Sequence, residues 1–208
     1  MPRFIIVGAG DFSAKDMPAE LLEDDYICAA DAGYLALCSI GVAPDLIIGD
    51  FDSMPEPTTT DIEKIKLAVV KDDTDISFCI KEGIRRGYKD FLILGALGGK
   101  RLSHTFANIQ LLSMLRDMGG NGMIQSSGTR LWLLKASESL TIEGEDGDLL
   151  SIYSLSDESE VSLQGLYYPL DHGIITRGFP LGVSNQFTSE DAIATVHSGE
   201  ALIIAEKQ

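Results

Sequence analysis

The first 121 residues of the chain alternate between short apolar runs and longer stretches in which apolar residues recur at helical spacing. The apolar runs occupy residues 4–8, 26–30, 45–49, 67–70 and 91–95. Helical spacing is found at residues 32–40, 61–66, 75–86 and 103–118. All of these runs except 67–70 are bounded on at least one side by Gly, Asp or Pro, as strands commonly are. Strands that alternate with helices predict a mostly parallel sheet covered by helices, which is the α/β class.

The spacing of apolar residues along the sequence changes after Gly122. Short β-rich runs then follow one another at spacings of about ten residues, with little helical periodicity, and this pattern is typical of an all-β sandwich or barrel. We therefore expect two domains: an α/β domain over residues 1–121 and an all-β domain over residues 122–208. The boundary is expected near Asn121-Gly122.

Charge and hydropathy exclude several classes of partner. The chain carries 32 acidic and 16 basic residues, a formal net charge of −16. We expect no nucleic acid partner, because binding a phosphate backbone normally requires a basic face. Apolar residues make up 45% of the chain, which argues against disorder, yet no apolar run reaches the ~18–20 residues that cross a bilayer. With no apolar signal core at the N-terminus, the sequence predicts a cytoplasmic protein without a membrane partner.

Acidic side chains follow successive strands of the predicted sheet. Asp50 and Asp52 come directly after the run 45–49, and Asp31 follows the run 26–30. The carboxyl ends of parallel strands form the edge at which open α/β sheets bind their ligands. Two carboxylates in so short a turn repel each other unless a cation lies between them, so the pattern favours a hard divalent ion such as Mg²⁺. A solvated acidic turn is the alternative.

A further acidic position opens the helix expected from residue 75. The segment reads Lys71-Asp72-Asp73-Thr74-Asp75. A helix N-terminus presents free amides to phosphate oxygens, so Lys71 is a candidate phosphate contact and Asp75 a candidate metal ligand. The expected ligand is a Mg²⁺-polyphosphate, because Mg²⁺ is usually held by few carboxylates together with substrate phosphates.

A glycine-rich segment supplies positive charge. Residues 95–104 read Gly-Ala-Leu-Gly-Gly-Lys-Arg-Leu-Ser-His, which fails the spacing of a P-loop. Glycines let the backbone approach a ligand, Arg101 offers its charge to phosphate, and Ser103 is expected to cap the helix that follows. His104 and Asn108, four residues apart, share one face of that helix. The sequence supports a structural and a ligand-binding role for His104 equally.

In this order, these segments resemble the thiamin pyrophosphokinase (thiamine diphosphokinase) family. The resemblance covers most of the chain and rests on Asp31-Ala32-Gly33, Pro44-Asp45, Gly49-Asp50-Phe51-Asp52-Ser53, Lys71-Asp72-x-Thr74-Asp75, Gly98-Gly99, Arg101, His104, Ala107-Asn108, Tyr168-Pro169-Leu170, Gly182-Val183-Ser184-Asn185 and Ser198-Gly199. The sequence departs from the family in the glycine loop, where there is an extra lysine and Ser103 replaces an acid.

The resemblance implies an N-terminal α/β domain for ATP and Mg²⁺, a C-terminal β-sandwich, and a homodimer with thiamine bound near the subunit interface. The implied activity is transfer of a diphosphoryl group from Mg-ATP to the hydroxyl of thiamine, giving thiamine diphosphate and AMP. The implied metal ligands are Asp31, Asp50, Asp52 and Asp75, of which the last three are also expected to be catalytic. We expect ATP contacts at Asp31, Lys71, Asp72, Thr74, Arg101, His104 and Asn108, and thiamine contacts at Ser184 and Asn185.

Two other functions are compatible with parts of the sequence. The departure at Ser103 suggests a nucleotide- or thiamine-binding protein without catalytic activity. The pair Asp50 and Asp52 suggests a Mg-dependent phosphatase that forms an aspartyl phosphate, although Met54 stands where those enzymes have Thr or Val. For the proton of the thiamine hydroxyl, the sequence leaves three acceptors open: Asp75, Asp73 and water.

Overall fold

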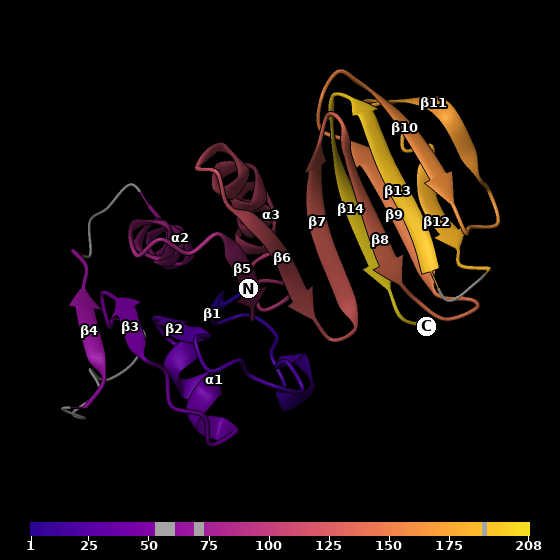
Figure 1. Cartoon of the computed structure of the whole chain (residues 1–208). Helices are drawn as coiled ribbons and strands as arrows, with labels where there is room; N and C mark the ends of the chain where they lie inside the picture. The colour runs from indigo at the N-terminus through magenta and orange to yellow at the C-terminus, as the bar shows by residue number, and fades with distance from the viewer. Residues whose placement is uncertain (53–60, 69–72, 189–190) are drawn as a thin grey trace. The chain divides into compact units, whose positions relative to one another are not determined.

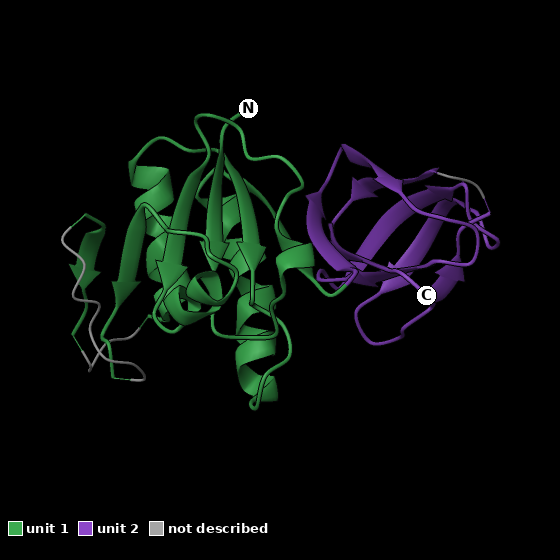
Figure 2. Ribbon diagram, turned by 90° about the horizontal axis from the view of Figure 1, so that it is seen from below, with its two compact units in different colours: residues 1–127 green, residues 128–208 purple. Residues whose placement is uncertain are grey.

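The computed structural model describes residues 1–52, 61–68, 73–188 and 191–208. These residues divide into two compact units, 1–127 and 128–208 (Figure 2). The division lies after Ser127 and not near Asn121-Gly122, because residues Asn121–Ser126 form a strand that pairs in parallel with Asp90–Leu94. The glycines at 119 and 120 therefore end a helix, as expected, but do not end the first unit.

The first unit is built on a parallel sheet with the order β6-β5-β1-β2-β3-β4 (Figure 1). Its strands are β1 (Arg3–Val7), β2 (Tyr26–Ala30), β3 (Leu46–Gly49), β4 (Glu63–Lys66), β5 (Asp90–Leu94) and β6 (Asn121–Ser126). The central strands are almost continuously apolar because both faces of the sheet are covered; every residue from Phe4 to Val7 is fully buried. The α/β class predicted from the alternation of runs is confirmed.

Helices cover both faces of this sheet. They are α1 (Gly33–Ser39), α2 (Asp75–Arg85) and α3 (Leu102–Asp117), with a short 3-10 helix, η1, at Ala14–Asp16. Figure 1 shows α1 on one face and α2 and α3 on the other. Leu37 of α1 joins an apolar cluster with Ile5 and Val7, whereas Gly83 of α2 lies directly over the rings of Phe4 and Phe91. None of the helices within the described ranges is long and apolar enough to cross a bilayer.

Three local expectations were wrong or fall outside the described residues. Residues 61–66 do not form a helix: Glu63–Lys66 is the edge strand β4, which pairs in parallel with β3, and its alternating charges suit an exposed sheet edge. The run 67–70 is not a strand at residues 67 and 68, and its other two positions lie outside the described residues. Ser103 is no helix cap, because α3 begins at Leu102 with Arg101 in the N-cap position.

The second unit is all-β. It contains two antiparallel sheets, with the orders β12-β9-β14-β7 and β11-β10-β13-β8. The strands are β7 (Thr129–Lys135), β8 (Glu138–Glu143), β9 (Leu149–Ser154), β10 (Glu158–Gln164), β11 (Leu170–Thr176), β12 (Gly182–Gln186), β13 (Asp191–Ser198) and β14 (Glu200–Glu206). Residues from both sheets, such as Val161, Val196 and Ile203, share one apolar core.

The strand order of the parallel sheet reverses at β1. The chain runs outward from β1 through β2, β3 and β4, and then returns to β5 on the other side of β1. In open α/β sheets the loops on either side of such a reversal diverge, and the crevice between them at the carboxyl ends of the strands is the usual ligand site. The edge formed by the loops after β1, β2, β3 and β5 is therefore where a ligand is expected.

Candidate active site

Three carboxylates converge at the carboxyl edge of the sheet. Asp31 follows β2, Asp50 and Asp52 follow β3, and each offers an oxygen that lies within 4.8 Å of the other two. The structure thus brings together three of the four acids that the sequence singled out as metal ligands. A set of donors made only of carboxylate oxygens fits a hard cation such as Mg²⁺.

Asp31 is held close to the end of β3. Its backbone is in the left-handed region (φ 46°), and its N–H donates to the carbonyl of Ile48 at 2.8 Å. A Cβ placed on Gly49 would lie 3.0 Å from both the Cα and the Oδ1 of Asp31. Only a glycine therefore leaves ordinary room for the Asp31 carboxylate at this point, and the residue remains just 8% exposed.

A strained turn presents the other two acids. Phe51, between them, has a φ of 60°, which is costly for a bulky residue and is found where surrounding structure enforces it. Its ring packs against the apolar cluster on the α1 side of the sheet, which anchors the turn. The N–H of Asp52 donates to Oδ1 of Asp50 at 3.2 Å. The packed Phe51 ring thus anchors the turn that carries the two acids.

The acids interact electrostatically. The pKa of Asp52 is raised, first by a hydrogen bond with the Asp50 side chain and by the negative charge of Asp50, and further by the charges of Asp31 and Asp75. Asp75, the first residue of α2, therefore lies within electrostatic reach of the cluster. A bound cation would relieve the repulsion among these four carboxylates.

The segment before α2 is organised by helix capping. The Thr74 hydroxyl accepts from the N–H of Ser77 at 3.2 Å, so this predicted ATP contact acts as the N-cap of α2. Asp73 accepts from Lys81 Nζ at 2.7 Å, and this contact lowers its pKa. Asp73 is therefore a poor proton acceptor. Lys71 and Asp72, also predicted at ATP, lie outside the described residues.

The glycine loop leads to Arg101, the cationic residue at the start of α3. Gly98 and Gly99 both have left-handed backbones, with φ values of 67° and 74°. Arg101 follows them and is exposed, as is His104 one turn along the helix. Asn108 donates from Nδ2 to the carbonyl of Ala96 at 2.7 Å, so its side chain braces the loop. Of the three residues predicted here as ATP contacts, Arg101 and His104 are exposed, whereas the Asn108 side chain is hydrogen-bonded to the backbone of the loop.

The predicted thiamine residues lie on β12 of the second unit. Asn185 is buried, and both ends of its amide bind the backbone of Tyr168: Oδ1 accepts from the N–H at 2.9 Å and Nδ2 donates to the carbonyl at 2.7 Å. Ser184 is exposed, has a φ of 55°, and donates its N–H to Ser151 Oγ at 3.0 Å. Asn185 thus holds a segment whose aromatic side chains are exposed, Tyr168 by 67% and Tyr167 by 64%.

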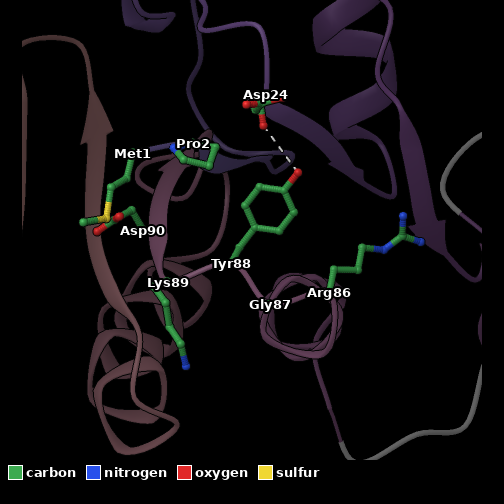
Figure 3. A pocket seen from close by; sticks show the side chains of 8 residues that line it. All are labelled: Met1, Pro2, Asp24, Arg86, Gly87, Tyr88, Lys89 and Asp90. Carbon is green, nitrogen blue, oxygen red and sulfur yellow. Dashed lines mark hydrogen bonds between the residues drawn. The ribbon is translucent and has the colours of Figure 1, made fainter.

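A hollow of about 430 Å³ lies at the opposite edge of the parallel sheet, where its strands begin (Figure 3). It is lined by Met1, Pro2, Asp24, Arg86, Gly87, Tyr88, Lys89 and Asp90. Tyr88 points its hydroxyl toward the carbonyl of Asp24 at 3.4 Å. The described residues predicted for catalysis or binding do not line this hollow, so it is separate from the acidic site.

Similarity to known proteins agrees with this geometry. Residues 18–121 match the family model described as "Thiamin pyrophosphokinase, catalytic domain", and residues 138–203 match "Thiamin pyrophosphokinase, vitamin B1 binding domain". The chain belongs to the thiamin pyrophosphokinase family. As a member of this family, it is an enzyme of the diphosphokinase class. The acids described above, Asp31 to Asp75, all fall within the part that matches the catalytic domain.

Individual relatives are similar to this chain over most of its length, in sequence or in fold. A thiamine pyrophosphokinase of Bacillus subtilis (strain 168) is 27% identical over 188 residues, which cover 88% of this chain and 87% of the relative. A crystal structure of the Bacillus subtilis enzyme superimposes with a TM-score of 0.85 at 23% identity, covering 99% of both chains. A thiamin pyrophosphokinase structure from Geobacillus thermodenitrificans gives a TM-score of 0.83 at 25% identity, covering 99% of this chain and 98% of that one.

Sequence reasoning missed the residues that shape the site without carrying its charge. Gly49 and Phe51 were noted only as parts of a motif, although one makes room for Asp31 and the other anchors the acidic turn. The signal was present in the printed sequence: a glycine directly after an apolar run, and an aromatic residue between two acids. Asp11, which contacts the glycine loop, was also missed, because it lies 88 positions before Gly99 in the sequence.

Proposed function

We propose that the chain transfers the diphosphoryl group of Mg-ATP to the hydroxyl of thiamine. The thiamine oxygen attacks the β-phosphorus and forms the new P–O bond. The bond between that phosphorus and the oxygen bridging to the α-phosphate breaks, and AMP leaves with that oxygen. The hydroxyl proton is lost to an acceptor, and thiamine diphosphate is formed. The observation that carries this proposal is the convergence of Asp31, Asp50 and Asp52 in a chain of this family.

The acidic cluster suits Mg²⁺ in its donor chemistry. Asp31, Asp50 and Asp52 offer only carboxylate oxygens within 4.8 Å of one another, and Asp75 lies within electrostatic reach. These four residues would hold the ion, which supplies charge neutralisation to the phosphates when it is bound. The acids thereby account for how a protein with a net charge of −16 binds an anionic triphosphate.

The remaining groups position the phosphates. Transfer of this kind asks little covalent chemistry of the protein, so orientation and charge dominate. We assign Arg101, which is exposed beside the glycine loop, to the phosphate oxygens, together with the N-terminal amides of α2. Asp75 is the preferred protein acceptor for the hydroxyl proton, because Asp73 is paired with Lys81. Lys71 and Asp72 remain proposed ATP contacts.

We assign thiamine binding to the second unit, around β12. The exposed ring of Tyr168 suits the cationic thiazolium ring, since aromatic faces attract cations. Ser184 is exposed on β12, and its neighbour Asn185 acts by holding the Tyr168 backbone. A homodimer with thiamine near the subunit interface remains part of the proposal, and sedimentation velocity of the purified protein tests it.

The decisive experiment is chromatography of a reaction that contains the protein, thiamine, Mg²⁺ and ATP. We expect AMP and thiamine diphosphate in equal amounts, with neither formed when thiamine or Mg²⁺ is left out. Binding of both substrates without AMP would instead identify a non-catalytic binding protein. Release of inorganic phosphate with a beryllofluoride-trapped aspartate would identify a phosphatase. Either result would refute the proposed transfer.

A further inference from the structure

Two loops are joined at the point where the strand order reverses. The loop after β1 and the loop after β5 are linked by three backbone hydrogen bonds. Gly8 N–H donates to the carbonyl of Leu94 at 2.8 Å, Gly10 N–H to that of Gly95 at 2.7 Å, and Asp11 N–H to that of Leu97 at 2.8 Å. The reversal point is the position at which open α/β sheets bind ligands, so this pair of loops lies where a nucleotide is expected.

The Asp11 side chain continues the contact between the two loops. Its Oδ1 accepts from the N–H of Gly99 at 3.1 Å. A Cβ placed on Gly98 would lie 1.9 Å from its Oδ2, so the carboxylate occupies the space that a side chain at residue 98 would fill. The carbonyl of Asp11 in turn accepts from Ser126 Oγ at 2.9 Å, which ties it to the end of β6. Asp11 is therefore fixed on one side and holds the glycine loop on the other.

The glycine loop needs such a restraint. Gly98 and Gly99 both have positive φ, and consecutive glycines have a large conformational entropy when nothing fixes them. Arg101 follows two residues later, and its reach toward a phosphate depends on the path of this loop. Asn108 fixes the same loop at the carbonyl of Ala96, upstream of the two glycines. Asp11 fixes it downstream, next to the cationic residue.

We propose that Asp11 is a positioning residue that holds the 95–99 loop so that Arg101 meets the triphosphate. This inference rests on the proposed use of ATP. Asp11 acts through the loop and not on the substrate, since its carboxylate is directed at the amide of Gly99 and the α-carbon of Gly98. The function of the side chain is to accept a hydrogen bond, and its negative charge is not required.

The test compares two substitutions at this position. Asp11→Asn keeps a carbonyl oxygen that can accept from Gly99, whereas Asp11→Ala removes it. We expect Asp11→Ala to raise the KM for Mg-ATP about 10-fold, because one hydrogen bond that fixes the loop is lost. The KM for thiamine and the Tm should change little. Asp11→Asn is expected to stay within about 3-fold of the unchanged protein. Glu23→Ala, which removes an acid from an exposed position, is the matched control.

A second measurement does not depend on turnover. Amide hydrogen exchange of the peptide that contains residues 95–101 should be faster in Asp11→Ala and unchanged in Asp11→Asn. Equal exchange and equal KM in all three proteins would overturn the proposal, as would an Asp11→Asn variant as defective as Asp11→Ala. If Asp11→Ala does not fold, Ser126→Ala is used, and it must shift both quantities in the same direction by a smaller amount.

These readouts keep the two proposals separate. If the unchanged protein forms no AMP, the proposed function fails, while the exchange measurement still reports whether Asp11 holds the loop. If the unchanged protein forms AMP but Asp11→Ala alters neither KM nor exchange, only the role of Asp11 fails.

Discussion

The carboxylate of Asp31 lies against the backbone of Gly49, so closely that a Cβ on Gly49 would stand 3.0 Å from Asp31 Oδ1. The two residues lie at the ends of neighbouring parallel strands, β2 and β3. The contact explains how one side of the acidic cluster is built. Strand β3, which leads to Asp50, ends in a glycine, and the Asp31 carboxylate after β2 occupies the space that a side chain at residue 49 would fill.

Replacing Gly49 by alanine should therefore displace Asp31. The methyl group forces the carboxylate to move by a few tenths of an ångström, and a metal ligand that loses its support typically costs 10–100-fold in metal affinity. We expect Gly49→Ala to weaken Mg²⁺ binding by about 10-fold, measured by the Mg²⁺ dependence of turnover. Gly178→Ala is the control, because a Cβ there meets no atom within 4 Å. Equal Mg²⁺ dependence in the two variants would contradict the role of Gly49.

Asp52→Asn should raise the stability of the metal-free protein and lower turnover. The pKa of Asp52 is raised by its acidic neighbours, so its charge is unfavourable while no cation is bound. Removing that charge should raise the Tm measured in EDTA, while the rise in Tm on addition of Mg²⁺ becomes smaller. Turnover should fall on the order of 10³-fold, because an interaction that neutralises developing charge is lost. A variant with near-native turnover would show that Asp52 is no part of the site.

Substitution of Asp73 and substitution of Asp75 should affect turnover very differently, although the two residues are only two positions apart. Asp73 is occupied by Lys81 at 2.7 Å, and an exposed ion pair contributes little energy, so Asp73→Asn should keep turnover within about 3-fold. Asp75 shares the field of the acidic cluster, so Asp75→Asn should lower turnover about 10²-fold or more. Steady-state rates at saturating thiamine and Mg-ATP distinguish the two. The reverse order would make Asp73 the functional acid.

The sequence predicted the parts of this fold in which local pattern and tertiary environment agree. Buried parallel strands are continuously apolar, and acids placed after them fall at one edge, so Asp31, Asp50 and Asp52 could be grouped from their positions along the chain alone. The segment 61–66 was wrongly predicted to be helical, because Glu-Lys-Ile-Lys at 63–66 is compatible with a helix and becomes a strand only through pairing with β3. Secondary structure at a sheet edge depends on pairing with a neighbouring strand, and the local sequence does not specify that pairing.

The same principle applies to the polar residues of the site, whose contacts with ATP or thiamine stay predictions. Asn185 and Thr74 have the side chains expected of ligand contacts, yet their hydrogen bonds go to Tyr168 and Ser77. A polar residue in a functional motif serves either the ligand or the backbone that presents it, and residue type alone does not distinguish the two. Asp11 is the converse case, since its proposed role depends on a contact across 88 positions of the sequence.

The last prediction concerns the end of α2 opposite to the active site. The carboxylate of Glu82 accepts from Arg85 at 2.6 and 2.7 Å and from Arg86 at 2.6 Å, and Arg86 also reaches Glu63 of β4 at 2.7 Å. The hydrogen bonds from Arg85 are the main cause of the lowered pKa of Glu82, about 2 instead of 4.5. Glu82 thus connects the helix to the edge of the sheet through Arg86.

A carboxyl group with a lowered pKa stabilises the folded state while it is ionised. Its contribution is present in full above the unfolded pKa near 4.5, and is lost as the pH falls from there through about 2. Glu82→Gln should lower the free energy of unfolding at pH 7 by about 1–2 kcal/mol, a figure reduced for the exposure of Arg85, and the difference from the unchanged protein should shrink by pH 3. Urea unfolding at pH 7, 4 and 3 measures it, with Glu23→Gln as control. A difference that is the same at all three pH values would show that the ion pairs of Glu82 do not stabilise the helix.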